Sequence, residues 1–148
     1  MKFSTRVRYG LRAMLELTLE GGGGPVPLVR LADRQRLSVK YLENLFQALR
    51  SAELVVATRG PRGGYRLSRP AEEITVLEIA QALDGRIHLV ECVANPRFCD
   101  QVSHCRTHPL WGELSRVLEE RMAGISLAQL ARNELGPASG PVGMGGEP

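Results

Sequence analysis

Apolar residues near the start of the chain recur with helical spacing. Between residues 4 and 20 they fall at every fourth position from Val7 onward, as on the buried face of an amphipathic α-helix. Four consecutive glycines at 21–24 and the prolines that follow predict the end of this helix and a fresh start. We therefore expect one helix over 4–20 and another that begins near Leu28.

Two further helices are predicted close together. The segment 28–34 is soon followed by Ser38, whose hydroxyl can cap the next helix by accepting a hydrogen bond from its first turn. That helix, 39–51, buries its leucines and Phe46 and turns polar residues outward. Two helices joined by so tight a connection predict a helix-turn-helix, a motif that any small helical protein can contain.

A short hairpin is predicted directly after these helices. Residues 54–58 and 65–68 are β-rich runs that flank a glycine-containing turn. The turn carries Arg59 and Arg62, long cations that suit phosphates or a narrow minor groove. This order of elements predicts a winged helix-turn-helix DNA-binding domain over residues 1–84, with an ordinary surface hairpin as the alternative.

The second half of the chain is expected to return to helix after an irregular stretch. A capping-box pattern at Thr75 predicts a short helix that stops at 84–85, and no periodicity is sustained from 86 to 109. A long helix is predicted after Pro109, followed by a short one that Ser126 caps. The fold class is therefore mainly α-helical with a small β-hairpin.

The long helix has an apolar face that must be buried against another surface. This face can pack against the core of the same chain. A DNA-binding protein, however, gains from two-fold symmetry, which favours a homodimer. The segment 110–135 is thus expected to hold the dimerisation helix and the short last helix, and the Gly- and Pro-rich tail 136–148 is expected to be disordered. The predicted dimerisation residues are Leu110, Trp111, Leu114, Val117, Leu118 and Met122.

Charge divides the chain into a basic and an acidic half. Residues 1–70 hold 13 Lys and Arg against 5 Asp and Glu, a net charge of +8, whereas residues 71–148 hold 6 against 11, a net charge of −5. This division suggests that the first half meets a polyanion and the second meets protein or a small ligand. The sequence has neither a membrane-spanning apolar run nor an apolar signal core, so we expect a soluble, cytoplasmic protein with no membrane partner.

Three cysteines and a histidine lie in the irregular segment 85–109. Their pattern is Cys92-x6-Cys99-x5-Cys105-x2-His108, and thiolates with imidazole are ligands that zinc and iron–sulfur clusters take. Zinc accepts such a set, yet structural zinc sites usually contain a CxxC pair, which is missing here. The wider spacing favours a cluster. Unrelated thiols and a nucleophilic cysteine are the other interpretations.

Several stretches of the chain together resemble the Rrf2 family of bacterial transcription regulators. The resemblance rests on residues 3–14 (FSTRVRYGLRAM), 37–46 (LSVKYLENLF) and 59–67 (RGPRGGYRL), and on the three-cysteine loop. It covers nearly the whole chain apart from the tail. Within the family, the loop and the Leu-Trp pair after its histidine are most similar to those of the iron–sulfur cluster regulator.

The resemblance implies a homodimer that binds operator DNA with two winged helices. The helix from Ser38 would lie in the major groove and the wing in the minor groove, while the long C-terminal helix crosses to the partner. A carboxylate such as Glu43 is repelled by phosphates unless it accepts a hydrogen bond from a cytosine N4 amine. The expected DNA-binding residues are Ser38, Lys40, Tyr41, Glu43, Arg59, Arg62, Lys2 and Arg8.

The resemblance also implies that the loop 85–109 binds an iron–sulfur cluster, [2Fe-2S] in preference to [4Fe-4S]. Its ligands would be Cys92, Cys99, Cys105 and His108. Arg36 stands where the family commonly has glycine. The expected function is that of a transcription regulator, not an enzyme, which senses iron–sulfur cluster status, redox state or nitric oxide. A cluster-free repressor controlled by a partner protein and an iron–sulfur redox protein are the alternatives.

Overall fold

The computed structural model describes residues 3–22 and 24–135, so that Lys2 and the predicted tail 136–148 lie outside the described residues. No helix of the described chain has the length and apolar character to cross a membrane. The elements follow in the order α1 Thr5–Glu20, α2 Leu28–Gln35, α3 Val39–Ser51, β1 Val55–Thr58, β2 Gly64–Leu67, the 3-10 helix η1 Ala71–Glu73, α4 Val76–Asp84, α5 Glu91–Ala94, the 3-10 helix η2 Pro96–Phe98, α6 His108–Ala123 and α7 Leu127–Ala131.

The winged helix-turn-helix is present in the predicted order. The bounds of α1, α2, α3 and both strands agree with the expected ones to within one residue. β1 and β2 pair antiparallel, with Val55 opposite Leu67 and Thr58 opposite Gly64. The segment before α2 joins this hairpin, because Val26 and Tyr65 exchange backbone hydrogen bonds of 2.8 and 2.9 Å.

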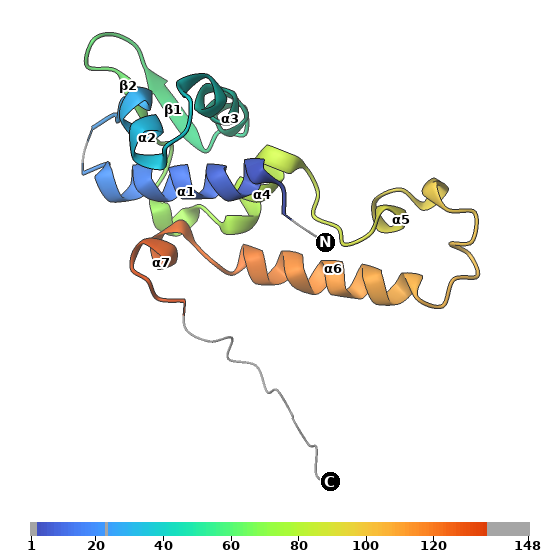
Figure 1. Cartoon of the computed structure of the whole chain (residues 1–148). Helices are drawn as coiled ribbons and strands as arrows, with labels where there is room; N and C mark the ends of the chain where they lie inside the picture. Colours follow the sequence, from blue (N-terminus) through green and yellow to red (C-terminus); the bar gives the residue numbers. More distant parts are fainter. Residues whose placement is uncertain (1–2, 23, 136–148) are drawn as a thin grey trace.

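α1 runs through the centre of the domain, between the winged helix-turn-helix and the pair α4 and α7 (Figure 1). Its residues Ala13, Met14 and Leu17 are fully buried. At Gly10 the helix lies so close to α4 that an added Cβ would stand 2.2 Å from Leu83 Cδ1. A side chain at this position would therefore separate two closely packed helices.

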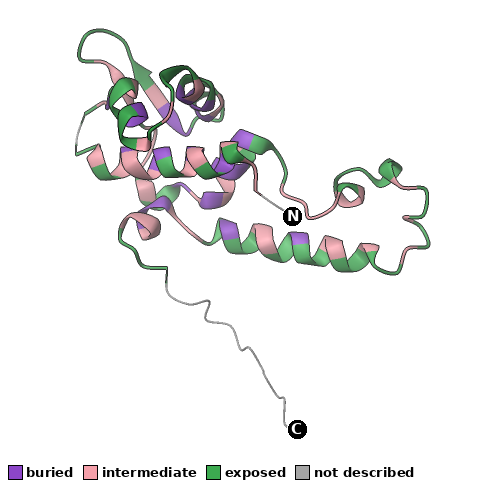
Figure 2. Ribbon diagram, in the orientation of Figure 1, coloured by how far each residue is buried: buried purple, intermediate pink, exposed green. Residues whose placement is uncertain are grey.

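Residues 85–123 form an arm that projects from the domain (Figure 1). The chain leaves α4, passes α5 and η2, and returns along α6; Figure 2 shows that most of this arm is exposed or half-buried. The expectation of an irregular segment up to Pro109 was wrong in one respect, because the segment contains α5 and η2. α6 begins at His108, so Pro109 lies in its first turn as predicted.

A buried serine ties the two sides of the arm together. The Ser115 hydroxyl accepts a hydrogen bond from the Leu89 backbone N–H at 3.0 Å and donates one to the Trp111 carbonyl at 2.8 Å. Such tertiary hydrogen bonds hold short helical turns that carry no sequence periodicity of their own, which explains why the arm was not predicted in detail.

The capping box predicted at the start of α4 is present. Thr75 Oγ1 accepts from the Glu78 N–H at 3.2 Å, and the Glu78 carboxylate accepts from the Thr75 N–H at 2.9 Å. Burial raises the pKa of Glu78, but hydrogen bonds from Thr75 and the charge of Arg69 outweigh it and lower the pKa. Thr75 also forms a β-bridge with Ser126, which ties the start of α4 to that of α7.

The apolar face predicted for α6 is divided between two sides of the helix. Met122 is buried and Leu118 is half-buried against the core of the domain, while Trp111 is half-buried. The neighbouring side carries three apolar residues that are 41–50% exposed, namely Leu110, Leu114 and Val117. One part of the predicted face thus packs within the chain, and the other part faces outward.

The turn between α2 and α3 is formed by a residue in the left-handed region. Arg36 has φ of 53° and ψ of 44°, and its N–H donates to the carbonyls of Ala32 and Asp33. This conformation costs a residue with a Cβ about 1–2 kcal/mol, whereas glycine adopts it freely. Arg36, which stands where the resemblance leads us to expect glycine, therefore forms a helix end at the cost of backbone strain.

We expect Arg36→Gly to raise the free energy of unfolding by about 0.5–1 kcal/mol, because relief of the strain exceeds the greater freedom of glycine in the unfolded chain. Arg36→Ala is the matched control, since it removes the same side chain but keeps the Cβ. Urea unfolding followed by circular dichroism measures both variants. A gain with alanine equal to that with glycine would contradict the strain explanation.

Candidate nucleic-acid interface and cysteine loop

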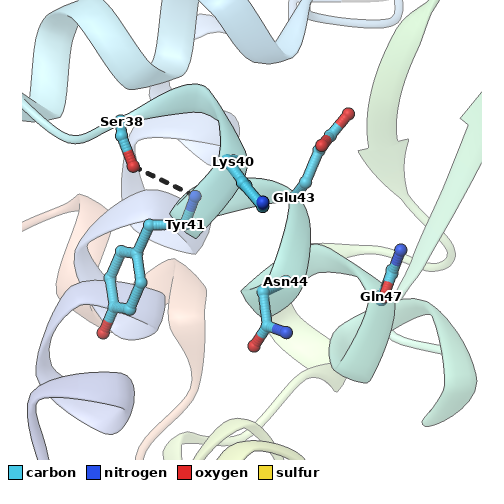
Figure 3. A pocket seen from close by; sticks show the side chains of 6 residues that line it. All are labelled: Ser38, Lys40, Tyr41, Glu43, Asn44 and Gln47. Atoms are coloured by element: carbon cyan, nitrogen blue, oxygen red, sulfur yellow. Dashed lines mark hydrogen bonds between the residues drawn. The ribbon is translucent and has the colours of Figure 1, made fainter.

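The exposed side of α3 forms a shallow hollow of about 510 Å3. Ser38 Oγ caps the helix by accepting from the Tyr41 N–H at 3.1 Å, and the leucines with Phe46 hold the opposite side in the core. This anchoring leaves polar side chains at i, i+3, i+4 and i+7 along the outer side. Figure 3 shows the six lining residues, which are Ser38, Lys40, Tyr41, Glu43, Asn44 and Gln47.

Four of these six residues were predicted as DNA-binding. Asn44 was expected to face outward but was not assigned a role, and Gln47 was missed. Continuing the helical spacing one turn beyond Lys40, Glu43 and Asn44 reaches Gln47, so periodicity alone would have found it. The hollow contains one cation and one carboxylate, Lys40 and Glu43, and is otherwise neutral and polar.

Aromatic contacts join α3 to a basic flank of α1. The rings of Tyr41 and Tyr9 meet edge to face, with centroids 6.2 Å apart. The guanidinium carbons of Arg8 and Arg12 lie 6.0 and 5.4 Å from the Tyr9 ring centroid, which is the range of cation–π attraction. Arg8, one of the predicted DNA-binding residues, is therefore exposed on the element that supports Tyr41.

The hairpin presents its two predicted cations at the tip. Arg59 and Arg62 are both exposed, and they lie in the turn that joins β1 to β2. The Gly63 N–H donates to the Gly60 carbonyl at 2.9 Å, and Gly60 has φ of 106°, a value that glycine adopts without strain. The hairpin tip and α3 lie at the same end of the molecule (Figure 1).

The four predicted metal ligands all lie on the outer part of the arm. Cys92 belongs to α5, Cys99 follows η2, Cys105 precedes α6, and His108 is the first residue of α6. All three cysteines fall within the described residues, and each is a free, half-buried thiol. Within residues 3–22 and 24–135, no three His, Cys, Asp or Glu side chains gather closely enough to hold a metal ion.

The structure nevertheless brings two of the four positions together. His108 Nε2 lies 3.1 Å from the Cys92 carbonyl oxygen, across 16 residues of sequence. Because a carbonyl oxygen only accepts, Nε2 carries the proton in this contact, which leaves the lone pair of His108 on Nδ1. A neutral imidazole with one nitrogen bonded to a backbone carbonyl is the state in which histidine usually ligates a metal.

Hydrogen bonds at the start of α6 favour the thiolate of Cys105. Its Sγ lies 3.2 Å from Thr107 Oγ1. This hydroxyl, and then the backbone N–H groups of Thr107 and His108, lower the pKa of Cys105. The thiolate is the form that binds metals. The donor types and the lowered pKa of Cys105 therefore fit an iron–sulfur cluster, although among the described residues their side chains are not assembled around one point.

Comparison with known proteins connects this geometry to a single family. The Rrf2 family model, described as an iron-dependent transcriptional regulator, matches residues 3–133. The regulator IscR of Sodalis glossinidius is 40% identical over 134 residues, which cover 90% of this chain and 81% of the relative.

Two solved structures share the fold over almost their whole length. The structure of IscR from T. potens has a TM-score of 0.73 at 34% identity and covers 91% of this chain and 89% of its own. CymR of B. subtilis, named as the global cysteine regulator, gives the same TM-score and identity over 90% of this chain and 98% of its own. The winged-helix fold and the family resemblance are thus confirmed.

Proposed function

Because this chain belongs to the Rrf2 family of transcriptional regulators, we propose that it binds operator DNA as a homodimer and senses its signal through an iron–sulfur cluster on the arm. The family and the named relatives are regulators, so its function is DNA-binding regulation of transcription and not catalysis. One observation carries the cluster proposal: His108 Nε2 contacts the Cys92 carbonyl, so this contact leaves Nδ1 as the ring nitrogen that would bind the cluster.

In the DNA complex, α3 would enter the major groove and the hairpin tip the minor groove. Ser38, Lys40, Tyr41 and Glu43 would then face base edges or the nearest phosphates. Arg59 would insert into the minor groove. The surrounding phosphates would be contacted by the remaining predicted cations, Arg62, Arg8 and Lys2.

The homodimer would be formed through α6. Its exposed side carries Leu110, Leu114 and Val117, three apolar residues that soluble monomers rarely align on one helix. Beside it, an apolar groove of about 530 Å3 lies between the start of α1 and α6. A two-fold axis would place the exposed side of one α6 against the same region of the second copy. Trp111, Leu118 and Met122 would support this interface from within each chain.

Cys92, Cys99, Cys105 and His108 would hold the cluster, and their mixed thiolate and imidazole set favours [2Fe-2S] over [4Fe-4S]. A bound cluster supplies a centre that responds to oxidants, nitric oxide and iron supply. Cys105 and His108 already lie at the start of α6, and His108 contacts Cys92. To hold the cluster, the loop would therefore have to bring Cys99 toward the start of α6. Since the arm connects α4 to the dimerisation helix, ordering it would change the angle between the two DNA-reading domains and so the operator that is bound.

Removal of the charge at two DNA-binding positions should have different effects. Arg59→Ala should weaken binding by about 1–3 kcal/mol through loss of a minor-groove contact, whereas Glu43→Ala should relax the choice of base at one position. Fluorescence anisotropy on a selected operator and its single-base variants measures both. Arg132→Ala, at the end of α7, is the control and should match the wild type. Unchanged affinity and selectivity in both test variants would contradict the assignment.

A charge on the exposed side of α6 should dissociate the dimer. Leu114→Glu and Val117→Glu would each bury a carboxylate in the interface, and we expect mainly monomers at micromolar concentration in sedimentation velocity. Ala123→Glu places the same charge on the opposite side of α6 and should leave the dimer intact. Dimers that persist in both test variants would show that this side of the helix is not the interface.

Anaerobically purified wild-type protein should be brown and contain iron and acid-labile sulfide in equal amounts. Serine at Cys92, Cys99 or Cys105 should abolish the chromophore, and His108→Ala should shorten its lifetime in air. His104→Ala is the matched control, because His104 is exposed and belongs to the same loop. A colourless, metal-free wild type that still binds DNA would favour the cluster-free regulator; a coloured protein without DNA binding would favour a redox protein.

A further inference from the structure

Arg6 links the DNA-reading helix to the end of α4. Its Nη1 donates to Asn44 Oδ1 at 2.5 Å, across 38 residues of sequence. Its Nε donates to the Leu83 carbonyl, in the last turn of α4, at 3.1 Å. Arg6 is half-buried and rises from the first turn of α1. Two hydrogen bonds to different elements therefore fix the guanidinium group, unlike that of a free surface arginine.

The contact with Arg6 determines which end of the Asn44 amide faces outward. Arginine has only donors, so the amide oxygen must turn toward it and the amide nitrogen must turn away. Asn44 is exposed in the hollow on α3, between Tyr41 and Gln47 (Figure 3). The side chain thus offers its N–H donors to whatever enters the hollow, while its oxygen is turned toward Arg6.

We propose that Arg6 is a specificity-determining positioning residue, which presents Asn44 to DNA as a donor only. This inference rests on the proposed placement of α3 in the major groove. An unconstrained asparagine pairs with adenine through both ends of its amide, donating to N7 and accepting from N6. With the oxygen held by Arg6, Asn44 faces the base edges with donors alone. It can donate to O6 and N7 of guanine or to O4 of thymine, whereas on adenine it keeps only the bond to N7 and has no acceptor for the N6 amine, which favours guanine or thymine over adenine.

The position of Arg6 explains why the orientation is maintained. The Leu83 carbonyl lies at the C-terminal end of α4, where the helix dipole attracts a cation. The distance between α1 and α4 is set by the tight contact of Gly10 with Leu83. The guanidinium is thereby held at a defined place beside α3, and the Asn44 amide is oriented before DNA arrives.

The test begins with an operator selected by the wild-type protein from randomised duplexes. Anisotropy titrations with every single base-pair change then give a preference at each position. Asn44→Ala identifies the position that Asn44 reads, where a preference of about 10-fold should fall to near unity. Arg6→Met, which keeps an apolar stem but no donor, should reduce discrimination against adenine at this same position and at no other.

Three further variants make the test decisive. Arg6→Met combined with Asn44→Ala should show no greater loss of preference than Asn44→Ala alone, because Arg6 acts through Asn44. Arg132→Met removes an exposed arginine far along the chain and should match the wild type. Asn44→Asp keeps a partner for Arg6 but presents an acceptor outward, so the preference should move to bases with an amino group, cytosine or adenine; this variant remains informative if Arg6→Met does not fold.

Three results would overturn the inference while leaving the proposed function intact, two of them in Arg6→Met and one in Asn44→Asp. One is an unchanged base preference in Arg6→Met; the other is equal weakening on all sequences, which would mark Arg6 as a phosphate contact. Retention of the wild-type preference in Asn44→Asp would likewise exclude Asn44 as the donor. If the wild-type protein selects no sequence at all, the proposed function itself fails.

Discussion

The packing of α1 against α4 is the contact on which the rest of the structure depends. α1 contacts the helices of the DNA-reading domain on one side and α4 and α7 on the other. Gly10 allows the close approach to Leu83, and a protein interior packed this densely has little room to adjust. The contact thus relates the surface that would meet DNA to the arm that follows α4. Arg6, one turn earlier on α1, adds a polar connection between these same elements.

Local sequence signals were sufficient to predict the domain that reads DNA. The helical spacing of apolar residues, the caps at Ser38 and Thr75, and the glycine-rich hairpin turn each act over a few residues, and each was found in the structure. The arm was predicted less well. Its turns depend on contacts such as Ser115 with Leu89, whose partners lie 26 residues apart and leave no periodic pattern.

The residues of the candidate site were likewise predicted only in part. Residues with a charge or a reactive group, such as Arg59 and the cysteines, are conspicuous in the sequence, so they were identified as candidates from residue type and spacing. Asn44 was assigned no role because an asparagine on an outer helix face resembles any solvated residue. The role that we propose for Asn44 depends on its hydrogen bond with Arg6, 38 residues away. On α6, periodicity located the apolar residues but did not indicate which of them pack within the chain, because that depends on the direction in which the arm leaves the domain.

The contact of His108 with Cys92 has a further consequence in terms of chain entropy. Gathering four ligands from an open chain requires several loop closures, and the cost of each grows with the logarithm of the loop length. In this arm the longest loop runs from the first proposed ligand, Cys92, to the last, His108. The hydrogen bond between these two residues already closes it. Only the shorter segments through Cys99 and Cys105 remain to be closed. For the proposed cluster, the arm would thus be a partly preorganised chelator, in which ordering the protein would cost less binding free energy than in an open chain.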